Sequence, residues 1–142
     1  MKVFADRLIN VLENHRREIA QQWCNAVRQN PRTASFTNFS EEELLKRAGF
    51  FYKNLITMYF SEKPYTEVRK YFSEYAEVSY RYKIPLHETL YALIMMRRHM
   101  WLYADFQEPF LSAMDHRQAV ETINKTIRIF DHGIYIITQR YG

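Results

Sequence analysis

Glycine, proline and cysteine are scarce in this sequence, and each scarcity disfavours a class of structure. The 142 residues include three glycines and four prolines, too few for the turns of a sandwich or barrel of many short strands. An all-β fold is therefore disfavoured, and long helices are favoured. The single cysteine, Cys24, cannot form an internal disulfide, and no cysteine or histidine cluster has metal-ligand spacing. The sequence thus excludes structural zinc and predicts no metal.

Long apolar stretches are also missing. No uncharged apolar run reaches the roughly 18 residues of a membrane-spanning helix, and Asp6 and Arg7 interrupt the region where a signal peptide needs an apolar stretch. We therefore expect a cytoplasmic protein that does not insert into a membrane. The formal net charge of +4 is spread among acidic residues, a pattern that does not indicate nucleic-acid binding.

Apolar and aromatic side chains, in contrast, are plentiful. Hydrophobic residues make up 47% of the chain and charged residues 25%, proportions typical of one globular domain over residues 1–142. Aromatic residues reach 16%, with eleven tyrosines and ten phenylalanines. Such a content indicates a bulky core, a pocket or a large subunit interface.

The first half of the chain predicts two helices joined by a loop. Apolar residues recur at three- and four-residue steps from about Val3 to Gln29, the period of an amphipathic helix. The segment Arg32–Asn38 has no period and is rich in Thr, Ser and Asn, so it is interpreted as the main loop. Ser40, followed by three glutamates, predicts a capping box with Glu43. The inward side chains of the helix that begins there are expected to be Leu44, Ala48, Phe51, Leu55 and Tyr59.

The second half predicts three further helices. Pro64 stands where a third helix begins, and this helix ends near Lys83 because Pro85 disfavours helical geometry at Ile84. A fourth helix, from Pro85 to about Phe106, is the most apolar and is expected to be central. With the segment that follows, the sequence predicts an all-α bundle of five to six helices with a long C-terminal helix.

The last helix, from Pro109 to Tyr141, carries a heptad pattern. One interpretation is a core helix that packs on its own domain, and apolar residues off the heptad seam, such as Ile129, fit it. The other is a dimer-forming helix. Gly133 costs about 1 kcal/mol relative to alanine, which indicates a close crossing or a tolerated weakness. The dimer interface predicted by the second interpretation consists of Val120, Ile123, Ile127, Phe130, Ile134 and Ile137.

No catalytic motif is present, so an enzyme is disfavoured. The five histidines fall in no known catalytic or metal-binding pattern, and glycine-rich phosphate loops are absent. Arg97 is the unusual residue, because it interrupts the most apolar helix. It pairs with a carboxylate such as Glu74 or Glu77, snorkels to a helix surface, or binds an anion inside an aromatic pocket. The pocket hypothesis groups Trp23, Tyr75, Arg97 and Trp101.

Five short stretches, taken in order, resemble the N-terminal sensory domain of RsbR-type proteins, the RsbT co-antagonists of the bacterial stressosome. The resemblance covers nearly the whole chain, and its motifs are short and degenerate but keep their order and spacing. They are Gln22-Trp23, Asn30-Pro31-Arg32, Phe39 to Leu44, Tyr82 to Leu86, and Leu93 through Arg97-Arg98 to Trp101.

The resemblance implies a globin-like helical fold without haem. It also implies a dimer through long helices, placed ahead of a signalling output domain such as a STAS domain or a kinase. Haem-binding sensor globins carry their proximal histidine in the neighbourhood of Glu77 to Tyr82, which here has none, and His87 lies in the next helix. The chain ends at Gly142 directly after the long helix, so we expect a stand-alone relative or a piece of a longer chain.

The sequence therefore predicts a non-enzymatic, cofactor-free sensory or regulatory domain of bacterial signal transduction. Its expected partners are a second copy of the chain, a signalling output protein or domain, and an unidentified small ligand. Two alternatives stay open. One is a haem-binding gas sensor that uses His87 or His99 as the axial ligand. The other is an adaptor whose exposed aromatic residues dock a partner protein.

Overall fold

A computed structural model describes the backbone of residues 2–107 and 115–142, and the side chains of 9–63, 65–101, 121, 122 and 124–142. The described residues form five α-helices and one 3-10 helix and contain no strand, which confirms the predicted all-α class. No described helix has the length and apolar character needed to cross a membrane. The elements are α1 (Lys2–Gln29), η1 (Pro31–Asn38), α2 (Glu41–Phe60), α3 (Pro64–Arg81), α4 (Leu86–Gln107) and α5 (Asp115–Tyr141).

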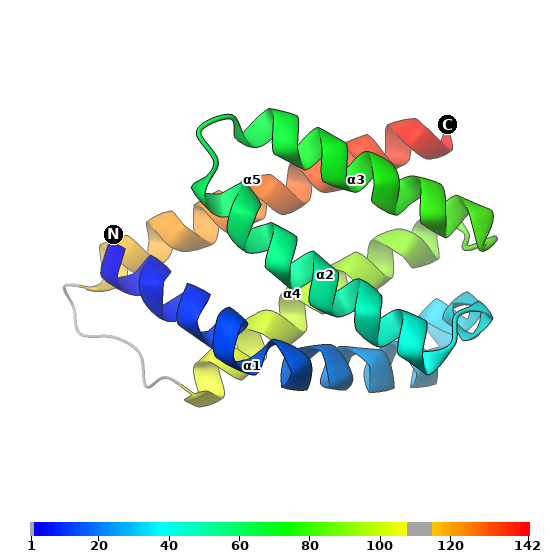
Figure 1. Ribbon diagram of the computed structural model, residues 1–142, viewed down its shortest axis with the longest axis horizontal. Coiled ribbons are helices and arrows are strands. Elements are labelled where there is room, and N and C mark those ends of the chain that lie inside the picture. Colours follow the sequence, from blue (N-terminus) through cyan, green and yellow to red (C-terminus); the bar gives the residue numbers. More distant parts are fainter. Residues whose placement is uncertain (1, 108–114) are drawn as a thin grey trace.

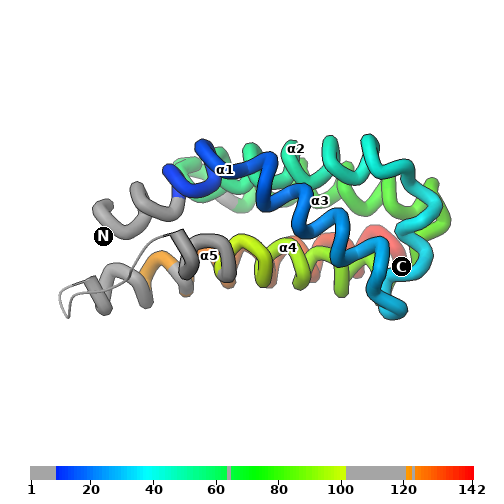
Figure 2. Tube along the Cα trace, turned by 90° about the horizontal axis from the view of Figure 1, so that it is seen from below, coloured from blue at the N-terminus to red at the C-terminus, as the bar shows by residue number. Residues whose placement is uncertain are grey.

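The helices lie in two layers. Figure 2 shows α2 and α3 on one side of the molecule and α4 and α5 on the other, with α1 running obliquely from the first layer toward the second. The two most extensive pairings are α3 with α5 and α1 with α2. In Figure 1, α3 and α5 cross obliquely, and α2 runs back in the direction opposite to α1. The backbone of α1 leaves helical geometry at His15.

The start of α2 forms as its sequence predicts. The Glu43 backbone N–H donates to Ser40 Oγ over 3.1 Å, and the Ser40 N–H donates to Glu43 Oε1 over 3.0 Å. This capping box satisfies two backbone donors that the first helical turn leaves unpaired. All five side chains predicted to point inward are buried, namely Leu44, Ala48, Phe51, Leu55 and Tyr59.

The predicted main loop, Arg32–Asn38, is instead the 3-10 helix η1, and this is a correction. Thr33, Phe36 and Phe39 are all buried, and their spacing of three matches the 3-10 repeat, in which residues i and i+3 share a face. The Thr33 hydroxyl donates to the Val27 carbonyl over 2.7 Å. These contacts are tertiary, so a search for α-helical or strand periods could not detect the element.

A tight motif joins α3 to α4. The Ile84 N–H donates to the Ser79 carbonyl and the Lys83 N–H to the Tyr80 carbonyl, each over 3.0 Å, the pair of bonds that defines a Schellman motif. Lys83 has a φ of 62° there, a left-handed conformation that glycine adopts more easily. The predicted end of α3 near Lys83 is therefore confirmed to within two residues.

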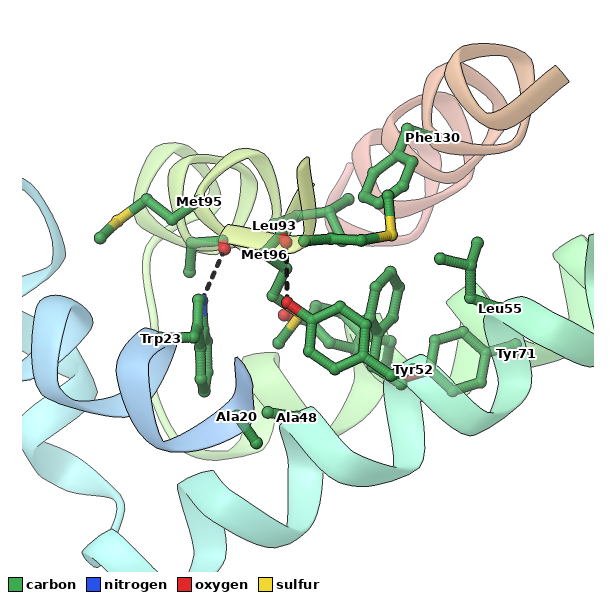
Figure 3. Packing of buried hydrophobic residues seen from close by; sticks show 14 of the residues in the cluster. Ala20, Trp23, Ala48, Tyr52, Leu55, Tyr71, Leu93, Met95, Met96 and Phe130 are labelled. Carbon is green, nitrogen blue, oxygen red and sulfur yellow. Dashed lines mark hydrogen bonds between the residues drawn. The ribbon is translucent and has the colours of Figure 1, made fainter. Parts of the chain in front are cut away.

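The most apolar helix, α4, lies against the core as expected. Figure 3 shows Trp23 of α1 and Tyr52 of α2 reaching toward it. Trp23 Nε1 donates to the Ala92 carbonyl over 3.0 Å, and the Tyr52 hydroxyl donates to the Met96 carbonyl over 2.7 Å. Both aromatic side chains have no exposed surface. Their polar atoms are thus satisfied on successive turns of one helix.

The described residues of the α5 heptad seam pack largely against the core of their own chain. Phe130 and Ile137 are 1% and 0% exposed, which corrects their assignment to an interface between chains. Ile134 is half-buried and packs against the core, and Ile127 is half-buried. The side chains of Val120 and Ile123 lie outside the described residues. Of the predicted interface, only Ile127 and Ile134 therefore keep described exposed surface.

Gly133 marks the crossing of α5 with α3. A Cβ atom placed on Gly133 would lie 2.7 Å from two ring atoms of Phe72, a side chain with no exposed surface. Two atoms cannot approach that closely, and the buried ring has no free space into which it could turn. Of the two meanings proposed for this glycine, the close crossing is the one observed.

Candidate functional site

The four residues of the predicted pocket have separate partners in the described part of the chain. Trp23 is buried against the Ala92 carbonyl and contacts the Phe36 ring edge to face, with centroids 6.3 Å apart. Tyr75 is buried in contact with Arg47. Trp101 is half-buried and packs against the core. A pocket lined by all four residues stays a prediction.

Arg97 is half-buried, and its guanidinium carbon lies 5.6 Å from the centre of the Phe130 ring. Glu77, one of the carboxylates considered as its partner, pairs with Arg140, with 2.5 Å between Nη2 and Oε1. Among the described residues, Arg97 forms no ion pair. Its environment is therefore an aromatic face, where a cation is attracted by the π electrons of the ring.

A second arginine, Arg47 of α2, occupies the environment that the sequence suggested for Arg97. Its guanidinium carbon lies 4.1 Å from the centre of the Tyr75 ring and 5.1 Å from that of Phe39. The Phe39 ring in turn stacks on Tyr82, with centroids 4.3 Å apart and an interplanar angle of 14°. Arg47 Nη2 donates to Ser79 Oγ over 2.7 Å. The cation is thus held between two aromatic rings and one buried hydroxyl.

The end of α5 reaches the same region. The Tyr141 hydroxyl donates to the Ile84 carbonyl over 2.8 Å. Because its one proton is used in this bond, its oxygen accepts from Thr89 Oγ1, 2.8 Å away. We call Arg47, Tyr75, Ser79, Thr89 and Tyr141 the Arg47 cluster. Its members come from four helices, α2 to α5.

Two polar atoms of the Arg47 cluster are buried without a hydrogen-bond partner among the described residues. They are Arg47 Nε and the Tyr75 hydroxyl. Tyr75 is 4% exposed. The three ion pairs of the described residues involve other side chains, so Arg47 has no carboxylate partner there. Leaving a buried polar atom unpaired costs about 1–3 kcal/mol. The Arg47 cluster is therefore a part of the core in which hydrogen-bonding groups lack partners.

Burial also affects how the neighbouring groups ionise. Burial raises the pKa of Tyr71 well above its usual range, and the nearby Tyr75 raises it further. Burial likewise raises the pKa of Tyr141. At the exposed edge, the hydrogen bond from the Tyr82 hydroxyl to Glu43, 2.5 Å long, lowers the pKa of that carboxyl. Burial therefore favours the neutral hydroxyl at Tyr71 and Tyr141.

The histidines considered as haem ligands do not face a common apolar crevice. His87 is exposed on the first turn of α4. His99 is half-buried, and burial, followed by the nearby Arg98, lowers its pKa. The space between α1, α2 and α4 is filled by side chains (Figure 3). Among the described residues, no group of three or more His, Cys, Asp or Glu side chains could hold a metal ion.

Arg47 was missed in the sequence, although a signal was present. It follows Leu44 by three residues and precedes Phe51 by four, and both of these neighbours are buried. These spacings place Arg47 on the inward face of the helix. The same criterion, a charged residue on the apolar face of a helix, had indicated Arg97. What the sequence could not provide was Tyr75 and Ser79, which come from α3.

No protein-family model, curated protein or solved structure matches this chain in the comparisons made. The resemblance to RsbR-type sensory domains and the globin-like arrangement therefore stay predictions.

Proposed function

We propose that this chain is a non-enzymatic sensory or regulatory domain of bacterial signal transduction that passes a change of helix packing to an output protein or domain. Its resemblance to the RsbR-type sensory domain motivates the proposal. The observation that carries it is the Arg47 cluster, where a cation that has no carboxylate partner in the described part of the chain lies between aromatic rings at the meeting point of four helices.

Such a cluster is suited to switching because its alternatives are close in free energy. A packed apolar core has one good arrangement, since any displacement opens a void. Arg47 Nε and the Tyr75 hydroxyl lack partners in the present arrangement, so a second packing that gives them water or an anion recovers part of that cost. A ligand or partner that favours one packing then shifts the population.

The route to the output runs through the end of α5. Tyr141 is the last residue of α5 and is hydrogen bonded to Thr89 and to the Ile84 carbonyl. Arg47 and Tyr141 both contact the segment around Ser79 and Ile84, where α3 turns into α4. A shift of Arg47 therefore changes the packing on which the last turn of α5 rests.

Hydrogen exchange tests this proposal without knowledge of the signal. Arg47→Met keeps an unbranched, flexible side chain but removes the guanidinium and its charge, so the Arg47 cluster becomes more apolar. We expect slower exchange of the amides of residues 76–81 and 134–138 in this variant, because the second packing loses its advantage. Arg47→Lys is the control and is expected to retain most of the wild-type exchange. Faster or unchanged exchange in Arg47→Met would show that the cluster is only structural.

Native mass spectrometry separates the alternatives. We propose a homodimer that contains no haem, and a dimer of unmodified mass is the expected result. A mass increase matching haem would support the gas-sensor alternative instead. Of the side chains predicted for a dimer interface, Ile127 and Ile134 keep described exposed surface, so Ile127→Glu is expected to weaken the dimer. Retained output-partner binding in Arg47→Met would favour the simple adaptor.

A further inference from the structure

A basic groove lies between α1 and α2, away from the Arg47 cluster. It has a volume of about 590 Å³ and is open to solvent. Four cationic side chains line it, two from each helix, and Glu42 is its one acid. The cations are Arg16, Arg17, Lys46 and Lys53.

None of these four cations is within 4.0 Å of a carboxylate among the described residues. Of the two acids next to Glu42 in the chain, Glu41 is paired with Arg28, with 2.7 Å between Nη1 and Oε2, and Glu43 interacts electrostatically with Lys46. The positive charge of the groove is therefore only partly offset, by Glu42 in its lining and by Glu43 near Lys46. An excess of cations attracts a negatively charged partner and speeds its association.

Part of the groove lining is apolar. It includes Ala20, Leu45 and Gly49, together with Phe50, which has 55% of its surface exposed. A Cβ atom added to Gly49 would meet nothing within 4 Å. Ala20 and Ala48 lie where α1 and α2 come together (Figure 3). The small side chains thus leave a hollow above a close helix contact.

We propose that this groove docks an acidic amphipathic helix of the output partner. This inference rests on the proposed function and deepens it. Apolar side chains of the partner helix would fill the hollow above Gly49. Its acidic side chains would pair with the cations of α1 on one side of the groove and of α2 on the other. A helix in a groove is a common mode of recognition between proteins. Lys46 and Lys53 are seven residues apart, or about 10.5 Å along the helix, a distance that two turns of a partner helix match.

The shape and composition of the groove favour this occupant over others. A small-molecule site buries 70–90% or more of its ligand's surface, which an open groove does not achieve. A membrane surface needs several protruding apolar residues, whereas Phe50 is the one exposed large apolar side chain of this lining; Ala20 is 3% exposed and Leu45 is half-buried. A nucleic acid needs a longer basic track and aromatic stacking, and Phe50 is the one aromatic residue here.

The test uses a synthetic peptide of about four turns, with leucine at positions i, i+3, i+4 and i+7 and glutamate on both flanks. Its affinity for the full chain is measured by fluorescence anisotropy at two salt concentrations. We expect binding that weakens at the higher concentration. A peptide of the same composition in scrambled order is expected to bind at least about tenfold more weakly, because it cannot present its leucines on one face.

Two variants locate the binding. Gly49→Leu places a side chain in the empty hollow and is expected to reduce affinity about tenfold or more, while Gly49→Ala retains most of it. The double charge reversal Lys46→Glu/Lys53→Glu is expected to reduce affinity about thirtyfold. Its matched control, Lys63→Glu/Lys70→Glu, changes the net charge equally on exposed positions outside the groove and is expected to bind as the wild type does. Thermal unfolding checks that each variant is folded.

Three results would overturn the inference: equal binding of the scrambled peptide, unchanged binding by Gly49→Leu, or a preference for anionic lipid vesicles or a single-stranded oligonucleotide over the peptide. None of them bears on hydrogen exchange around Arg47. A failed peptide titration with the expected exchange result would therefore reject the groove alone. The reverse combination would reject the switching cluster and leave the groove in place.

Discussion

The two main helix pairs each contain a glycine in mid-helix, and the two glycines have opposite surroundings. In the α3/α5 pair, a Cβ atom on Gly133 would lie 2.7 Å from the Phe72 ring. In the α1/α2 pair, a Cβ atom on Gly49 would meet nothing within 4 Å. One glycine permits a close crossing between helices, and the other leaves a basic groove open.

This difference teaches that a helical glycine has no fixed meaning in a sequence. Both residues carry the same propensity cost, about 1 kcal/mol relative to alanine. At Gly133 the close packing of α5 on α3 offsets that cost. At Gly49 no contact within the described chain offsets it, which is expected where a surface is kept open for a partner. The α3/α5 pair is therefore core, and the α1/α2 pair is the side we assign to binding.

The strongest test of this difference exchanges one phenylalanine of each pair for alanine. Phe72→Ala removes a ring with no exposed surface and is expected to lower the free energy of unfolding by about 3–5 kcal/mol. Phe50→Ala removes a ring that is 55% exposed and is expected to change it by about 0.5 kcal/mol or less. Urea unfolding measures both. Similar losses in the two variants would mean that the groove is part of the core.

The glycines themselves give the next largest effect, with opposite signs. Gly133→Ala is expected to destabilise by up to about 2 kcal/mol, because overpacking costs about 1–3 kcal/mol and better helix propensity offsets about 1. Gly49→Ala is expected to stabilise by up to about 1 kcal/mol. The clash also predicts that Phe72→Ala/Gly133→Ala loses less stability than the sum of the single variants. Additive losses would argue against the close crossing.

A smaller effect is expected at the turn that follows α3. Lys83 has a φ of 62° and an exposed side chain. Lys83→Gly should stabilise the protein by about 1 kcal/mol, since a side chain in the left-handed region costs about 1–2 kcal/mol and the extra freedom of unfolded glycine cancels part of the gain. Lys70→Gly, at an exposed position inside α3, should instead destabilise by about 1 kcal/mol. A destabilised Lys83→Gly would contradict the Schellman geometry.

The smallest effect is pH dependence at the start of α2. The hydrogen bonds from Tyr82 and Ser40 lower the pKa of Glu43 from its ordinary 4.5. A carboxyl whose pKa is lowered by folding stabilises the folded state above that ordinary value, and the contribution disappears as the pH falls through the lowered pKa. Glu43→Gln should therefore reduce the acid-side slope of stability against pH. Glu42→Gln, its exposed neighbour, is the control. Equal slopes in Glu43→Gln and the wild type would contradict this assignment.

The elements predicted well from the sequence are those encoded locally. The capping box at Ser40 and the helix stop before Pro85 depend on a few adjacent residues, and both were predicted correctly. The 3-10 helix Pro31–Asn38 was missed because its order comes from distant contacts, such as the two hydrogen bonds of 2.8 Å from Ser35 to Glu88. The heptad pattern of α5 was ambiguous, because the same spacing of apolar residues occurs whether they face the core or a second chain. Phe130 is buried in the core of its own chain.

The sequence predicted an arginine surrounded by aromatic residues, but it did not indicate Arg47 as that arginine. An arginine within an aromatic surround was expected at Arg97, and Arg97 does face Phe130. The more enclosed example is Arg47, whose partners Tyr75 and Ser79 come from another helix. Sequence periodicity can place a charged residue on an inward face, but the residue that meets it there depends on how the helices pack.

NMR relaxation dispersion tests the central claim, that the Arg47 cluster has two packings, most directly. The account predicts exchange on the microsecond-to-millisecond timescale at Ser79, Thr89 and the last turn of α5 in the wild type, and its loss in Arg47→Met. Flat dispersion profiles at these residues in the wild type, or exchange that persists unchanged in Arg47→Met, would contradict it.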